Sequence, residues 1–155
     1  MAIKILLPLD GSKSGESAIP NVEDIVSKFK PELNPEVILF HVITDAYSYI
    51  SDKYENQPLS MRGNERREAE AKAIDYLNKV GELMKAKGIK FVPKVAVGLA
   101  ADEIIKFAKD DRVDMIVMST LGSTGINKWE FGSVTNRVIH METRIPILII
   151  KATGK

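Results

Sequence analysis

The sequence predicts an α/β fold: a three-layer, five-stranded and mostly parallel sheet with helices on both faces. Five short apolar runs recur along the 155 residues, and a helix-forming segment separates each run from the next. Continuous apolar runs of this length are typical of strands that are covered on both faces. Helical connections between consecutive strands require right-handed crossovers, which make the strands parallel. We expect a single domain over residues 1–155.

The expected elements follow one another in the order β-α-β-α-β-α-β-α-β. The strands are expected at residues 3–7, 37–42, 91–97, 115–118 and 146–150. The helices are expected at about residues 18–29, 65–87, 100–108 and 133–141. Pro20 places the start of the first helix just before it, because proline is tolerated in the first turn and not later. Pro93 places the third strand at a sheet edge or a strand start.

Composition and charge exclude several classes of function. The 22 basic and 21 acidic residues nearly cancel, so no strong field points to nucleic acid or to a membrane surface. Cysteine is absent, which removes disulfides, thiol catalysis and cysteine-bound zinc. The two histidines lie far apart in sequence, and we expect no metal site. Without a signal-peptide pattern or a long apolar span, the sequence favours a cytoplasmic protein.

A loop rich in serine, threonine and glycine follows the fourth strand and leads into the last helix. In open parallel sheets, ligands bind outside the carboxyl ends of the strands. Glycines let the main chain come close to a ligand, and the N–H groups at a helix start favour an anion. The stretch from Ser119 to Ser133 therefore predicts a phosphate-binding loop.

The chain resembles the universal stress protein family over essentially its whole length. Nucleotide-binding members of that family carry G-x2-G-x9-G-(S/T) after the fourth strand. Here the corresponding residues are Ser119, Gly122, Gly132 and Ser133, with Ser119 in place of the first glycine. The segments that match the family's first, fourth and fifth strands are residues 5–12, 114–118 and 145–150.

The resemblance implies an adenine-nucleotide site: ATP, ADP or AMP, with any Mg²⁺ held mainly by the phosphates. The implied contacts are Pro8, Leu9 and Val42 for the base, Asp10 for the ribose, Met118 and Ser119 for the floor, and Gly122, Gly132, Ser133 and Val134 for the phosphates.

Several of these residues also have a simpler structural interpretation. Asp10 is suited to bracing the turn before the first helix, and Ser133 is a favourable helix N-cap. Gly122 is suited to a loop, and Trp129 to covering apolar surface. His41 lies within an apolar strand, and we expect it to be a hydrogen-bonded core histidine.

Two functions of different classes remain open from the sequence. The first is an ATP- or adenine-nucleotide-binding regulatory protein of the stress response, gated by nucleotide. The second is a partner-binding dimer of the same fold that holds no nucleotide. An enzyme lacks support, because the Walker sequence and other nucleotide-transferring signatures are absent, and we assign no catalytic residue. Any ATP hydrolysis is expected to be slow.

The last strand predicts self-association. Residues 145–150 form a flat, apolar run, and an exposed strand edge of that kind pairs readily with another chain. The resemblance implies a two-fold homodimer through Ile145, Ile147 and Ile149. A regulatory protein partner is expected but not identified, and neither nucleic acid nor membrane is expected as a partner.

Overall fold

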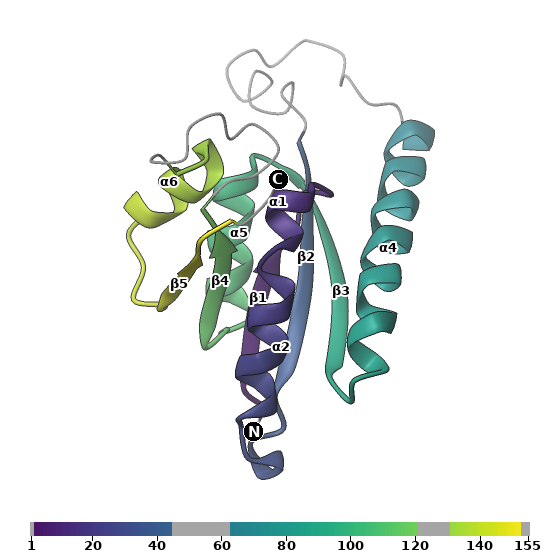
Figure 1. Ribbon diagram of the computed structural model, residues 1–155. Helices are drawn as coiled ribbons and strands as arrows, with labels where there is room; N and C mark the ends of the chain where they lie inside the picture. Colours follow the sequence, from purple (N-terminus) through teal and green to yellow (C-terminus); the bar gives the residue numbers. More distant parts are fainter. Residues whose placement is uncertain (1, 45–62, 121–130, 153–155) are drawn as a thin grey trace.

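Parallel strands form the sheet of the computed structural model, which describes residues 2–44, 63–120 and 131–152. In chain order the strands are β1 (Lys4–Pro8), β2 (Glu36–Thr44), β3 (Lys90–Gly98), β4 (Met115–Ser119) and β5 (Ile147–Ile150). Their order across the sheet is β3-β2-β1-β4-β5, and each neighbouring pair is parallel (Figure 1). The predicted α/β fold is confirmed.

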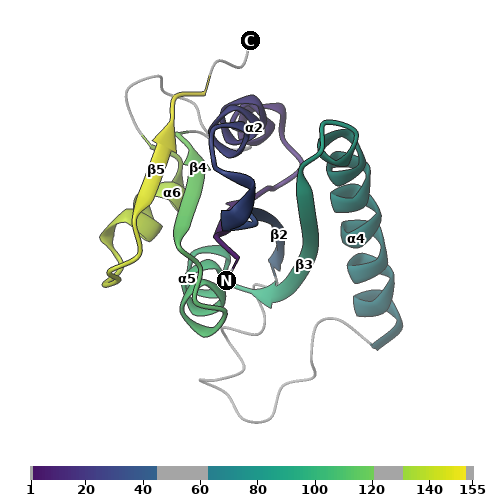
Figure 2. The same cartoon turned by 90° about the horizontal axis from the view of Figure 1, so that it is seen from below.

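Helices cover both faces of this sheet. They are α1 (Lys13–Glu16), α2 (Ile19–Ser27), the 3₁₀ turn η1 (Pro31–Leu33), α4 (Gly63–Lys85), α5 (Ala100–Asp110) and α6 (Ser133–His140). Helices α2 and α4 pack on one face, and α5 and α6 pack on the other (Figure 2). None of the described helices is long and apolar enough to span a bilayer.

Consecutive residues of β1 belong to two different cores. Ile5 and Leu7 pack with α2 and α4, whereas Leu6 packs with α5 and α6. All three side chains are fully buried. Because successive side chains of a strand point to opposite faces, a strand covered on both sides must be apolar at every position. This requirement explains the continuous apolar run in the sequence.

The expected element boundaries need some correction. The first expected helix is α2, with Pro20 in its first turn as predicted, whereas the short helix α1 before it was not expected. Strand β2 continues to Thr44, beyond the expected end at residue 42, because each of its residues pairs with β3. Strand β3 lies at a sheet edge, as Pro93 predicted.

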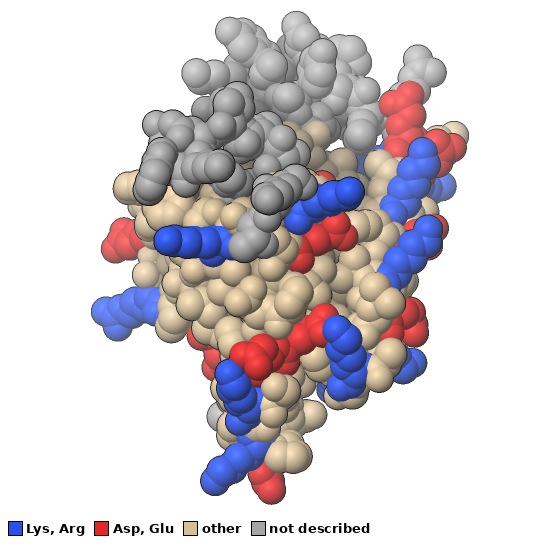
Figure 3. All heavy atoms as spheres, viewed as in Figure 1, with Lys and Arg blue, Asp and Glu red and all other residues tan. Residues whose placement is uncertain are grey.

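The sheet order creates a crevice beside β1. From β1 the chain continues to β2 on one side, and it later returns to place β4 on the other side. At such a switch the connections leave in opposite directions, and the carboxyl ends of the two strands are left open to a ligand. On the surface shown in Figure 3, basic and acidic side chains are interspersed across the described residues.

Candidate ligand-binding site

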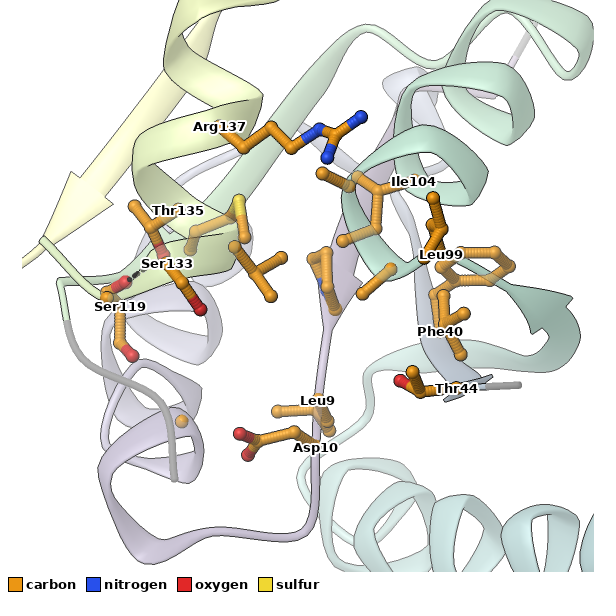
Figure 4. Close-up of a pocket in the computed structure, with 18 residues that line it drawn as sticks. Leu9, Asp10, Phe40, Thr44, Leu99, Ile104, Ser119, Ser133, Thr135 and Arg137 are labelled. Atoms are coloured by element: carbon orange, nitrogen blue, oxygen red, sulfur yellow. Dashed lines mark hydrogen bonds between the residues drawn. The ribbon is translucent and has the colours of Figure 1, made fainter. Parts of the chain in front are cut away.

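A cavity of about 460 Å³ lies at the carboxyl ends of β1, β2 and β4, between the first turns of α5 and α6 (Figure 4). It is lined by Pro8, Leu9, Asp10, Gly15, Phe40, Val42, Thr44, Leu99, Ala100, Ala101, Ile104, Met118, Ser119, Gly132, Ser133, Val134, Thr135 and Arg137. Each predicted site residue that the structure describes is in this lining. Gly122 and Trp129 lie outside the described residues.

One side of the cavity is apolar. Phe40 and Val42 contribute from β2, and Leu99, Ala101 and Ile104 contribute from the start of α5. The Phe40 ring is fixed from behind, since it stacks on the ring of Phe107 with 4.8 Å between centroids. A flat apolar ligand group therefore meets a preformed wall on this side.

The turn after β1 is fastened to β2 at Leu9. The Leu9 N–H donates to the Phe40 carbonyl oxygen at 2.8 Å. The Leu9 carbonyl oxygen lies 2.7 Å from Nδ1 of His41. A carbonyl only accepts, so the His41 Nδ1 carries the proton. His41 is thus hydrogen-bonded, as the sequence predicted, but it is half-buried where a core position was expected.

Asp10 both braces its turn and faces the cavity. Its carboxylate accepts hydrogen bonds from the Ser12 N–H at 2.9 Å and from the Ser12 hydroxyl. The Ser12 oxygen in turn accepts from the Gly15 N–H at 3.0 Å, which caps helix α1. Gly11 has φ of +85°, a conformation that favours glycine. The turn thus holds an exposed carboxylate at the cavity wall.

The start of helix α6 forms the opposite, polar side of the cavity. Its N-cap is Gly132, whose carbonyl accepts the first helical bond from the Asn136 N–H at 2.9 Å. The expectation that Ser133 is the N-cap was wrong, because Ser133 is already the first helical residue. The N–H groups of Ser133, Val134 and Thr135 consequently have no acceptor within the helix, which is the arrangement that attracts anions.

Gly132 precedes helix α6 and is buried in the cavity lining. Its N–H donates to the Thr120 carbonyl oxygen at 2.7 Å, so this donor is engaged within the protein. Its φ of −58° is open to any residue.

Ser119, at the position where the expected motif has its first glycine, ends β4 in an ordinary backbone conformation. It pairs with Ile150 and has no positive φ. The buried Thr135 hydroxyl donates to the Ser119 carbonyl oxygen at 2.9 Å and ties the start of α6 to β4 (Figure 4). A serine at this position therefore costs nothing in backbone strain.

A half-buried tyrosine lies near the Asp10 turn. The Tyr76 hydroxyl is itself buried close to the Glu16 carboxylate and the Gly11 backbone, but it makes no hydrogen bond of ordinary geometry within the described residues. Burial raises the pKa of Tyr76, and the nearby carboxylates of Glu16 and Asp10 raise this pKa further. The ring contacts His41 edge-on, with 6.3 Å between centroids. Tyr76 is therefore a neutral side chain near the turn.

Part of the cavity lining was not expected from the sequence. Ala101 and Ile104 recur at helical spacing, a pattern that signals core packing and does not distinguish a cavity wall. Arg137 is an exposed helix residue with no motif around it. A signal for Thr135 was available, since its position two residues after Ser133 places it in the first turn.

Comparisons with known proteins identify relatives of this chain and solved structures that share its fold. The universal stress protein MJ0577 of Methanocaldococcus jannaschii is 30% identical over 157 residues, covering 96% of this chain and 94% of that protein. Its solved structure has a TM-score of 0.78 at 28% identity and covers 100% of this chain and 99% of that chain. YxiE of Bacillus subtilis, also a universal stress protein, is 27% identical over 150 residues, covering 96% of this chain and 98% of that protein.

More distant structures share the fold. One is a universal stress protein family protein from Arabidopsis thaliana with AMP bound, at 18% identity and a TM-score of 0.64; the match covers 98% of this chain and 93% of that chain. A family model described as "Universal stress protein family" matches residues 1–151 of this chain. The chain therefore belongs to the universal stress protein family.

Proposed function

We propose that this protein binds an adenine nucleotide in the cavity at the carboxyl ends of β1, β2 and β4, and that it acts as a regulatory protein of the stress response. One observation carries the proposal. A preformed apolar wall and the N–H groups of a helix start face the same cavity of about 460 Å³. An adenine ring needs the first of these features and a phosphate needs the second.

Two relatives support the choice of ligand. The Arabidopsis thaliana structure has AMP bound, and a second universal stress protein structure is a complex with cAMP. That second structure is 17% identical to this chain, with a TM-score of 0.61, covering 98% of both chains. Both ligands are adenine nucleotides.

The residues present fit such a ligand. Phe40 and Val42 offer apolar surface to the base, and Asp10 offers a carboxylate to the ribose hydroxyls. The N–H groups of Ser133 and Val134 are oriented for phosphate at the start of α6. Any Mg²⁺ would be held mainly by ATP phosphates, since Asp10 is the only carboxylate in the described lining.

Binding, not catalysis, is the proposed activity. The described lining contains no histidine, lysine or second carboxylate that would work with Asp10 as an acid–base pair. We expect ATP hydrolysis, if measured, to be slow. Bound nucleotide then acts by changing the contacts that the molecule makes with a protein partner or with a second copy of this chain.

The edge strand β5 supports a homodimer in the same proposal. Among the described strands, β5 pairs only with β4, and its four residues are all half-buried and apolar. Such an edge presents unpaired backbone groups together with apolar side chains to a second copy. A dimer that forms without nucleotide binding is the alternative function.

Calorimetric titration with ATP and AMP tests the proposal. We expect saturable binding to the wild type and its loss in Gly132→Val, because the new side chain enters the buried cavity lining. Gly88→Ala is the control, since Gly88 lies at the end of α4, outside the cavity lining. A folded wild-type dimer that takes up neither nucleotide would instead establish the partner-binding alternative.

A further inference from the structure

One charged pair at the cavity has no role in the site described so far. Arg137 projects from α6 toward α5 beside Ile104 (Figure 4). It is the only lysine or arginine in the described cavity lining. Since residues four apart share a helix face, Arg137 lies one turn beyond Ser133 on the same side of α6.

The partner of Arg137 is Asp102 on α5. Nη2 of Arg137 lies 3.3 Å from Oδ1 and 3.5 Å from Oδ2 of Asp102. The two side chains are 58% and 41% exposed. An ion pair that is this long and this open to water contributes little net stability. Asp102 therefore orients the Arg137 guanidinium, but the ion pair is weak enough for the guanidinium to exchange it for another anion.

We propose that Arg137 is a specificity-determining residue that favours ligands bearing phosphate charge, and that Asp102 opposes this preference. The proposal rests on the nucleotide-binding function above. A guanidinium forms charge-assisted, two-point hydrogen bonds with phosphate, and phosphate carries more charge than the Asp102 carboxylate. A phosphate at the start of α6 therefore competes for Arg137.

Because Arg137 and Asp102 carry opposite charges, the proposal predicts that neutralising them changes the preference for phosphate in opposite directions. Loss of Arg137 removes positive charge from the cavity and leaves Asp102 uncompensated beside it. Loss of Asp102 leaves Arg137 to act with the positive end of the helix dipole on the ligand. If the pair only holds α5 against α6, both changes instead loosen the same contact and shift binding in the same direction.

The experiment is a calorimetric titration of four proteins with four ligands. The proteins are the wild type, Arg137→Gln, Asp102→Asn and the double variant. The ligands are adenosine, AMP, ATP and inorganic tripolyphosphate. Arg137→Lys keeps the positive charge but removes the planar guanidinium, so it distinguishes the effect of charge from that of two-point hydrogen bonding. Thermal melting of each variant verifies folding.

For Arg137→Gln, we expect the ratio of ATP to adenosine affinity to fall about tenfold. For Asp102→Asn, we expect the same ratio to rise about threefold, and the double variant to lie near Arg137→Gln. Arg137→Lys is expected to retain part of the preference. Shifts of the same sign in both single variants, or an unchanged ratio in Arg137→Gln, would overturn the proposal.

Tripolyphosphate separates this inference from the proposed function. One outcome is that tripolyphosphate affinity falls in Arg137→Gln and rises in Asp102→Asn while adenosine and nucleotides do not bind. The role of Arg137 then stands and the adenine site is wrong. If nucleotides bind with unchanged ratios, the adenine site stands and the role of Arg137 is wrong. Absence of binding for all four ligands would contradict both.

Discussion

Gly15 leaves room for the carboxylate of Asp10. A Cβ at this position would lie 3.0 Å from Oδ1 of Asp10 and 3.2 Å from Oγ of Ser12. Its backbone is helical, with no positive φ that would strain another residue. Glycine is therefore needed here for close approach and not for conformation.

Gly15→Ala is accordingly expected to weaken nucleotide binding without loss of stability, because alanine favours the helix by roughly 0.5–1 kcal/mol. Gly88→Ala is the matched control, and we expect it to lower stability while nucleotide binding stays unchanged. Gly88 has φ of +80° and open space around it, so the substitution strains the backbone and leaves the cavity unchanged. Calorimetry and thermal melting of both variants measure the two effects. Equal losses of binding in the two variants would contradict this distinction.

Tyr76 links the stability of the fold to alkaline pH. Its pKa is raised above the ordinary value of 10.0, so the folded protein favours the neutral hydroxyl. The stabilising contribution is therefore complete below about pH 10 and is lost as the pH rises further. Tyr76→Phe removes the titrating group together with a buried hydroxyl that has no partner within the described residues.

We expect Tyr76→Phe to be at least as stable as the wild type at neutral pH, since an unpaired buried hydroxyl costs free energy. Above about pH 10, the free energy of unfolding is expected to fall less steeply in the variant. Urea unfolding at a series of pH values measures both. The other tyrosines titrate in both proteins, so parallel curves would show that Tyr76 is not the group responsible.

At the scale of elements, threonines join the start of α6 to the ends of two strands. Thr135 donates its hydroxyl to the Ser119 carbonyl oxygen at the end of β4. Thr120 donates its N–H to the Ile150 carbonyl oxygen at 2.8 Å, and its hydroxyl accepts from the Ala152 N–H at 3.0 Å. Its carbonyl accepts from the Gly132 N–H. The helix start is therefore fixed relative to the last strand.

Thr135→Val is expected to destabilise the protein by about 1–3 kcal/mol, because the buried Ser119 carbonyl loses this hydrogen bond. It is also expected to weaken ATP binding more than adenosine binding, since only the phosphates contact α6 in the proposed site. Thr135→Ser keeps the hydroxyl and serves as the control. Equal weakening of ATP and adenosine would show that Thr135 acts only on overall stability.

At the scale of the whole molecule, the two sheet edges differ in a way that predicts where a second copy pairs. β3 carries Pro93 and the exposed Lys94, features that discourage pairing, whereas β5 reads ILII. We expect Ile149→Lys to shift the protein toward monomer in sedimentation velocity. Val92→Lys places the same charge on a half-buried position of β3 and is expected to leave the dimer intact. A dimer that persists in a folded Ile149→Lys variant would exclude β5 as the interface.

The sequence was sufficient to predict the sheet and half of the described cavity lining, because both depend on local patterns. Apolar runs such as 3–7 have few alternatives in a chain of alternating strands and helices, and the loop residues around Gly132 carry a motif. The N-cap was misassigned because serine and glycine are both suited to that position, and only the bond from Asn136 distinguishes them. The α5 wall was missed because Ile104 has the same spacing whether it faces a core or a cavity.

Nuclear magnetic resonance titration of the labelled protein with AMP locates the bound nucleotide directly. We expect the backbone amides of Ser133, Val134 and Thr135 to shift strongly on binding, together with those of Asp10 and Val42. Shifts confined to the separate cavity of about 450 Å³ near Asn34 and Gly88, or the absence of any shift at saturating AMP, would contradict this expectation.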